Sequence, residues 1–127
     1  MSLTIVLSIG FDPSLLETRS LVLQSAGYMV ESASSLKEAV NRFQSGDFDL
    51  VLLCRSVPRK DRDHLTSLIR ASGSRIPIVS IAGNLGERDA FANATLEDGP
   101  NNLLAGIRDV LVKAEKTPAW AFNSGNR

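Results

Sequence analysis

The feature that most constrains this chain is an uninterrupted apolar run at residues 50–53, which is followed by Cys54. Apolar residues that do not alternate with polar ones are typical of a strand covered on both faces, as in the middle of a parallel sheet. Runs of the same character occur at residues 4–9 and 76–81. Because parallel strands need long crossover connections, which are usually helices, we predict an α/β fold in which Cys54 ends a central strand.

Turn residues and helix caps divide the rest of the chain. Asp12 is a good N-cap with Pro13 at the first helical position, and Ser34 or Ser35 can cap a second helix. Strands are expected at residues 4–9, 28–33, 50–53, 76–81 and 94–96, and helices at about 13–25, 36–45, 64–71, 87–91 and 102–116, the last capped by Asn101 or Asn102. This alternation predicts a doubly wound, five-stranded parallel sheet with helices on both faces and strand order 2-1-3-4-5.

Composition excludes several classes of protein. The 127 residues contain 14 Lys and Arg against 14 Asp and Glu, so no overall field recruits nucleic acid or a membrane surface. No apolar run approaches the ~20 residues of a membrane span. The single cysteine cannot form an internal disulfide, which fits a cytoplasmic protein. We expect one domain at residues 1–116 and a tail at 117–127, whose Trp120 and Phe122 dock on this domain or, less favoured, on a partner.

Five stretches form a pattern that is specific only in combination. They are residues 12–16 (DPSLL), 46–53 (GDFDLVLL), 57–58 (VP), 75–79 (RIPIV) and 99–100 (GP). Over residues 4 to about 115, the chain resembles the receiver domain of two-component response regulators. The resemblance implies a flavodoxin-like receiver fold and a place in bacterial phosphorelay signalling.

In that family, a histidine kinase transfers a phosphoryl group to an aspartate beside a Mg²⁺ ion. Carried over by position, the acidic pair that holds the metal falls on Gly10 and Phe11, and the nucleophile falls on Cys54. The hydroxyl residue falls on Ala82 and the lysine on Gly99. The interval between these last two is also about one helical turn shorter than in the family, which implies a shortened fourth helix region. The resemblance therefore implies a degenerate receiver domain.

These replacements remove the chemistry that the resemblance would otherwise imply. Mg²⁺ prefers oxygen ligands that include carboxylates, and a thiol is too soft for it. Without a metal, a lysine or a hydroxyl group, nothing neutralises the charge on a transferred phosphoryl group. We therefore expect no metal, no cofactor and no aspartyl phosphorylation. The chain also lacks a paired acid–base constellation, so we expect it not to be an enzyme.

Two functions remain open at this point. The first is protein–protein interaction in two-component signalling, with a histidine kinase, an output domain or a second copy of the chain as partner. The second is a thiol-based or small-anion sensor built from Cys54 and the basic loop after it. Its candidate anion-binding residues are Arg55, Arg59, Lys60 and Arg62.

Overall fold

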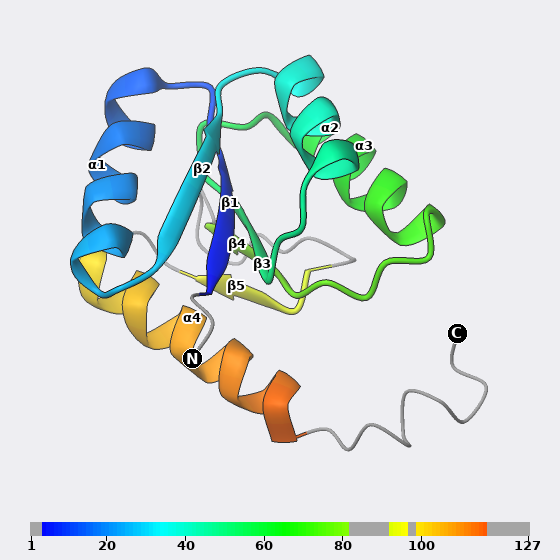
Figure 1. Cartoon of the computed structure of the whole chain (residues 1–127). Coiled ribbons are helices and arrows are strands. Elements are labelled where there is room, and N and C mark those ends of the chain that lie inside the picture. Colours follow the sequence, from blue (N-terminus) through cyan, green and yellow to red (C-terminus); the bar gives the residue numbers. More distant parts are fainter. Residues whose placement is uncertain (1–3, 82–91, 97–98, 117–127) are drawn as a thin grey trace.

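A five-stranded parallel sheet, in the order β2-β1-β3-β4-β5, lies between two layers of helices (Figure 1). The computed structural model describes residues 4–81, 92–96 and 99–116. The strands are β1 (Ile5–Ile9), β2 (Met29–Ala33), β3 (Leu50–Leu53), β4 (Ile78–Ile81) and β5 (Ala94–Leu96). The helices are α1 (Pro13–Ser25), α2 (Leu36–Ser45), α3 (Arg59–Ala71) and α4 (Pro100–Lys116). The predicted doubly wound α/β fold and its strand order are confirmed.

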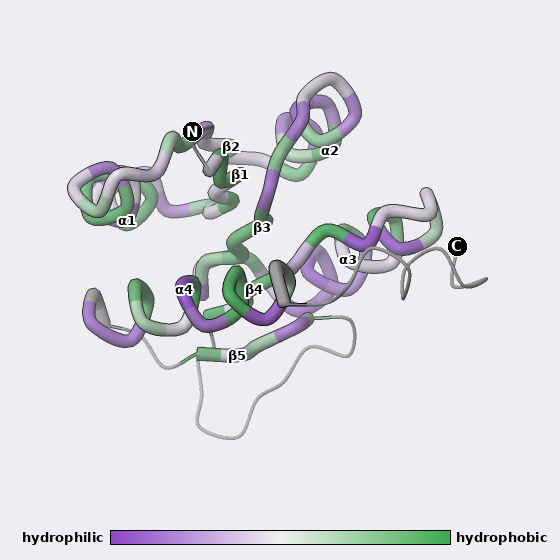
Figure 2. Tube along the Cα trace, turned by 60° about the horizontal axis from the view of Figure 1, so that its bottom comes forward, coloured by the Kyte–Doolittle hydropathy of each residue, from purple (hydrophilic) through white to green (hydrophobic). Residues whose placement is uncertain are grey.

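The core has two halves, one on each face of the sheet. Helices α1 and α4 cover one face and α2 and α3 the other (Figure 1). Strand β3 contributes to both halves, with Leu50 and Leu52 on the α1–α4 side and Val51 and Leu53 on the opposite side. All four side chains are fully buried, and Figure 2 shows hydrophobic segments along β3 and β4 between the helices. The apolar run therefore predicted the central strand correctly.

Capping residues begin the first two helices as the sequence predicts. The Asp12 carboxylate accepts hydrogen bonds from the N–H groups of Ser14 and Leu15, at 3.1 and 3.3 Å, and Pro13 follows it as the first helical residue. Ser35 caps α2, because its hydroxyl accepts from the N–H of Glu38 at 3.1 Å. Side-chain oxygens thus satisfy N–H groups that the helices leave without partners at their first turns.

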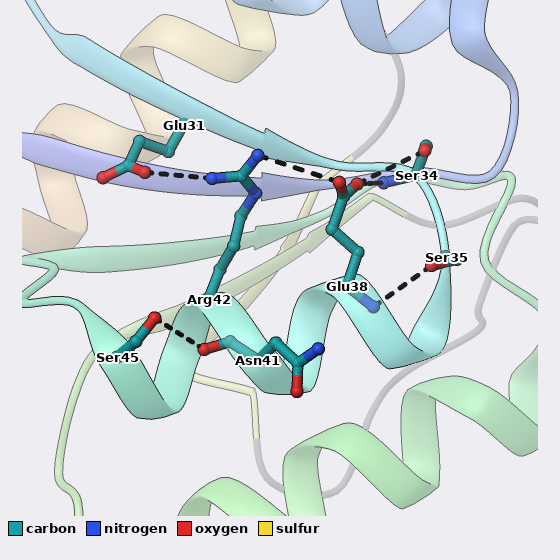
Figure 3. A network of polar contacts seen from close by, with 7 residues as sticks. All are labelled: Glu31, Ser34, Ser35, Glu38, Asn41, Arg42 and Ser45. Carbon is teal, nitrogen blue, oxygen red and sulfur yellow. Dashed lines mark hydrogen bonds and ion pairs between the residues drawn. The ribbon is translucent and has the colours of Figure 1, made fainter.

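A polar network then joins α2 to the edge strand β2 (Figure 3). The Glu38 carboxylate accepts from the N–H of Ser34 at 2.7 Å and lies 3.7 Å from the Arg42 guanidinium. Arg42 also pairs with Glu31 of β2, at 3.2 Å. All these groups are partly exposed, so we assign the network to the orientation of α2 rather than to a large gain in stability.

Two helices begin earlier than the sequence predicts. Helix α3 starts at Arg59 instead of near residue 64. The prediction missed its first turn because the inward-facing residue there is Arg62, which apolar periodicity does not reveal. Helix α4 starts at Pro100, and the carbonyl of Gly99 accepts from the N–H of Leu103 at 2.9 Å. The cap expected at Asn101 or Asn102 is therefore wrong, since proline already has the backbone angle of a first helical residue.

Several expectations fall outside the described residues. They are the helix at 87–91 and the shortened fourth helix region to which it belongs, Ala82, and the tail at 117–127. No helix in the described part of the chain is long and apolar enough to cross a membrane.

Candidate functional site

The candidate site lies where β1 and β3 end side by side. The N–H of Cys54 donates to the carbonyl of Ile9 at 2.8 Å, so residues 10 and 54 meet at the carboxyl edge of the sheet. A Cβ added to Gly10 would lie 3.1 Å from the Cys54 Cβ and 3.3 Å from the Ser56 Oγ. These distances are tighter than ordinary van der Waals contact. Gly10 therefore allows the two strand ends to approach closely, and a larger side chain would have to displace them.

Ser56 joins the two loops that follow these strands. Its Oγ accepts hydrogen bonds from the N–H of Phe11 at 2.9 Å and from the N–H of Asp12 at 3.3 Å. Phe11 is half-buried and packs on the α2–α3 side of the core. The sequence analysis missed Ser56. Its only signal was a hydroxyl residue close to the end of a central strand.

The Cys54 thiol is enclosed in the core. Its residue is 0% exposed and belongs to the apolar cluster on the α1–α4 side. Its Sγ lies 3.9 Å from the Ser8 Oγ, within range of a weak hydrogen bond. A reactive cysteine needs access and a stabilised thiolate, whereas a buried free cysteine behaves as a small hydrophobic residue. This position disfavours a sensor that acts through Cys54.

We expect the Cys54 thiol to be protected from modification in the folded protein. A maleimide should label it only at the rate at which the native structure opens, and should label it rapidly in concentrated urea. Since Cys54 is the only cysteine, the mass of the intact protein reports its labelling directly. Labelling of the native protein as fast as that of the unfolded chain would show an accessible thiol and would support the sensor.

The position of Arg62 differs most from its predicted place in an anion-binding loop. It is only 2% exposed, and its guanidinium lies inside the fold at the ends of β3 and β4. Nε donates to the carbonyl of Val57 at 2.8 Å, Nη1 to the hydroxyl of Ser80, and Nη2 to the carbonyls of Cys54 and Ile81 at 2.9 and 2.6 Å. One side chain of α3 thus links two strands and the loop between β3 and α3.

The structure therefore separates the four candidate anion-binding residues. Arg62 is internal, whereas Arg55, Arg59 and Lys60 are exposed. Arg59 pairs with Asp63, one turn further along α3, at 3.7 Å. The four cations do not form one cluster, because α3 already begins at Arg59 and turns Arg62 away from solvent.

Among the residues that the structure describes, the remaining positions implied by the resemblance offer no group that could replace the missing ones. Gly99 has φ +142° and offers no cation at the start of α4, and Ala82 lies outside the described residues. The described residues contain no group of three His, Cys, Asp or Glu that could hold a metal ion. Gly10, Phe11 and Cys54 supply no carboxylate, so these residues do not fit Mg²⁺.

A partly buried arginine, Arg70, lies at the opposite, amino edge of the sheet. Arg70 donates to the carbonyls of Ser74 and Ile76, and its Nη2 donates to the Asn93 Oδ1 at 3.0 Å. Burial, and then the neighbouring charge of Arg75, lower the pKa of the Arg70 guanidinium. Arginine remains charged at neutral pH in spite of such a shift. We therefore assign Arg70 to the connection between α3, β4 and β5.

Comparison with known proteins supports the assignment of the fold. No protein-family model matches the chain. The transcription factor SKN7 of Saccharomyces cerevisiae is 28% identical over 100 residues, which are 79% of this chain and 16% of SKN7. The swarming motility regulation protein RssB of Serratia marcescens is 35% identical over 85 residues, which are 65% of this chain and 37% of RssB. The chain thus spans well under half the length of either relative.

Solved structures match over most of their length. The CheY-like response regulator receiver domain protein of Methanospirillum hungatei superposes with a TM-score of 0.79 and 22% identity, covering 92% of this chain and all of that one. The response regulator TrrA of Thermotoga maritima, in complex with Mg²⁺ and BeF, gives 0.75 and 22%, covering 85% and 99%. The chain therefore has the fold of CheY-like receiver domains.

Proposed function

We propose that this chain is a receiver-like domain of bacterial two-component signal transduction that works in the cytoplasm without taking up a phosphoryl group. The observation that carries the proposal is the burial of Cys54, which follows the end of β3 and is 0% exposed. The resemblance to receiver domains implies the phosphoacceptor position for this residue. The fold and the sequence likeness to RssB support the signalling context.

The chemistry around Cys54 supports the absence of phosphoryl transfer. Such a transfer needs a nucleophile in line with the phosphorus atom and cations that neutralise the equatorial oxygens. The thiol is enclosed, a Cβ added at Gly10 would lie only 3.3 Å from its Sγ, and the described residues contain no group of three His, Cys, Asp or Glu that could hold a metal ion. Arg62 donates to the main-chain carbonyls of Cys54 and Ile81. Hence the site retains the receiver geometry without the groups that perform the reaction.

Because the Cys54 thiol is enclosed, we infer that the domain acts through its surface. We propose that the domain binds a protein, namely a histidine kinase, an output domain or a second copy of itself, and that it is not an enzyme and does not contact nucleic acid directly. The face formed by β5 and α4 is the proposed contact region, and α4 also carries Val112, an apolar side chain that is 38% exposed. Binding would then depend on the amounts of the two proteins and not on phosphorylation.

We expect no covalent product when the protein is incubated with acetyl phosphate and Mg²⁺. The mass of the intact protein should stay unchanged, because a buried cysteine and not an aspartate follows the end of β3. The receiver TrrA of T. maritima, which binds Mg²⁺ and BeF in its solved structure, is the matched positive control. A stable increase by the mass of one phosphoryl group, located to an aspartate of this chain, would refute the proposal.

A second measurement tests the interaction. Histidine kinases from the same genome can be titrated against the full chain with and without ATP. We expect binding to at least one of them, or self-association in light scattering, with the same affinity in both conditions. Binding that appears only after kinase autophosphorylation would contradict a phosphorylation-independent role.

A further inference from the structure

A groove at the amino edge of the sheet has no role in the site described above. It lies between the C-terminal half of α4 and the beginnings of β4 and β5, which lie beside this helix in Figure 1. Its volume is about 260 Å³. Sites for small molecules and cofactors are usually larger, at about 300–1,000 Å³, so the size suits one large side chain better.

The chemistry of the groove suits an amphipathic aromatic group. It is lined by Arg75, Pro77, Asn93, Ala94, Asp109, Val110, Lys113 and Ala114. The apolar members can cover a ring, and the two cations can lie over an aromatic face. Asp109 pairs with Lys113 at 3.1 Å and can accept from an N–H group. Since an acid and a polar amide stand among the cations, the lining does not select a simple anion.

The chain itself contains one side chain of this kind in the right place. Trp120 is the only tryptophan of the sequence, and it follows the end of α4 by four residues. Four residues can span up to ~14 Å, whereas the helix rises only ~9 Å between Val110 and Lys116. Pro118 lies between them and disfavours continuation of the helix. A chain that turns back after Lys116 can therefore place Trp120 beside the groove.

We propose that the indole of Trp120 occupies this groove within the same molecule, so that residues 117–122 cover the space between α4 and the start of β5. The segment then shields part of the β5–α4 face, and a partner that binds there has to displace it. The docking itself does not depend on the signalling role proposed above. If the docking of Trp120 is refuted, the proposed signalling role is unaffected, and the reverse also holds.

The single tryptophan reports its own environment. In the full-length protein, we expect its fluorescence to be blue-shifted relative to the unfolded chain, with acrylamide quenching several-fold weaker. The substitution Ala114→Glu places a charge at the exposed rim of the groove. It should shift the emission to the red and raise the quenching several-fold while the circular dichroism stays native. The matched control is Ala105→Glu, at an exposed position of the same helix outside the groove, which should change neither.

An independent measurement follows the residues that line the groove. The substitution Trp120→Ala should shift the amide signals of Asn93, Ala94, Val110 and Ala114 and leave those around Cys54 unchanged. The proposal would be overturned if Trp120 in the native protein emitted like free tryptophan. It would also be overturned if Ala114→Glu left Trp120 protected from acrylamide quenching. Protection that disappears on dilution would assign the groove to a second copy of the chain and would equally refute it.

Discussion

Replacing Arg62 by methionine is expected to lower the free energy of unfolding by about 3 kcal/mol, because buried acceptors lose their donors. Methionine fills a similar volume but cannot donate to the carbonyls of Val57, Cys54 and Ile81. Each buried acceptor without a partner costs roughly 1–3 kcal/mol. Relief from burying a charged guanidinium offsets part of that loss, which is why the expected total is smaller than the sum.

Urea unfolding, followed by circular dichroism, measures the effect of Arg62→Met. The matched control is Arg59→Met, one turn earlier on α3, where the side chain is exposed and pairs with Asp63 at 3.7 Å. An exposed pair of this kind contributes at most about 1 kcal/mol. Equal stability losses for the two variants would show that the buried hydrogen bonds of Arg62 do not hold β3 and β4 together.

A second large loss of stability is expected for Cys54→Asp, which introduces the residue type that the resemblance to receiver domains implies for this position. The residue is 0% exposed, and its neighbours at the end of β1 are Gly10 and the hydroxyl of Ser8. Burial raises the pKa of a carboxyl group, and the Arg62 guanidinium that lies at the Cys54 carbonyl already donates to main-chain carbonyls. A rise of about 2 pH units corresponds to roughly 3 kcal/mol of lost stability at neutral pH.

The loss in Cys54→Asp should depend on pH in one direction. The folded-state pKa of the new carboxyl lies above its unfolded value of about 4. Below that unfolded value the group is protonated in both states, so only the change in packing remains and the loss of stability should be smallest. As pH rises from there to the folded-state pKa, the unfolded chain gives up the proton more readily, and stability is progressively lost.

Unfolding curves for Cys54→Asp in acid and at neutral pH, with Cys54→Ala as the control, distinguish this effect from simple loss of packing. The alanine variant should lose stability equally at both pH values. A neutral-pH stability of Cys54→Asp equal to the wild type would show that the site accommodates a carboxylate. The interpretation that the enclosed site around Cys54 excludes a charged group would then be wrong.

The prediction of the fold from sequence succeeded because it rested on local signals. The apolar run of β3, the caps at Asp12 and Ser35 and the glycines between elements each act within a few residues. Their order along the chain, together with right-handed crossovers, leaves few topologies. The start of α3 was missed because its inward-facing residue is Arg62, and an arginine carries no apolar signal.

The candidate site was predicted only in part. Sequence comparison by position correctly brought Gly10 and Cys54 to one edge, since parallel strands end together. It treated Arg62 as a surface cation and did not consider Ser56, because both roles depend on contacts between residues far apart in the chain. The residues adjacent in sequence do not determine which carbonyls a long side chain will contact in the folded protein.

The sequence by itself determined the order of the described strands and helices and the residue types Gly10, Phe11 and Cys54, which carry no carboxylate. These are properties of residue type and spacing, which the chain carries before it folds. Only the tertiary structure decided that the Cys54 thiol is enclosed and that Arg62 points inward to the ends of β3 and β4. The physical reason is that burial and hydrogen bonding are set by packing between elements distant in sequence.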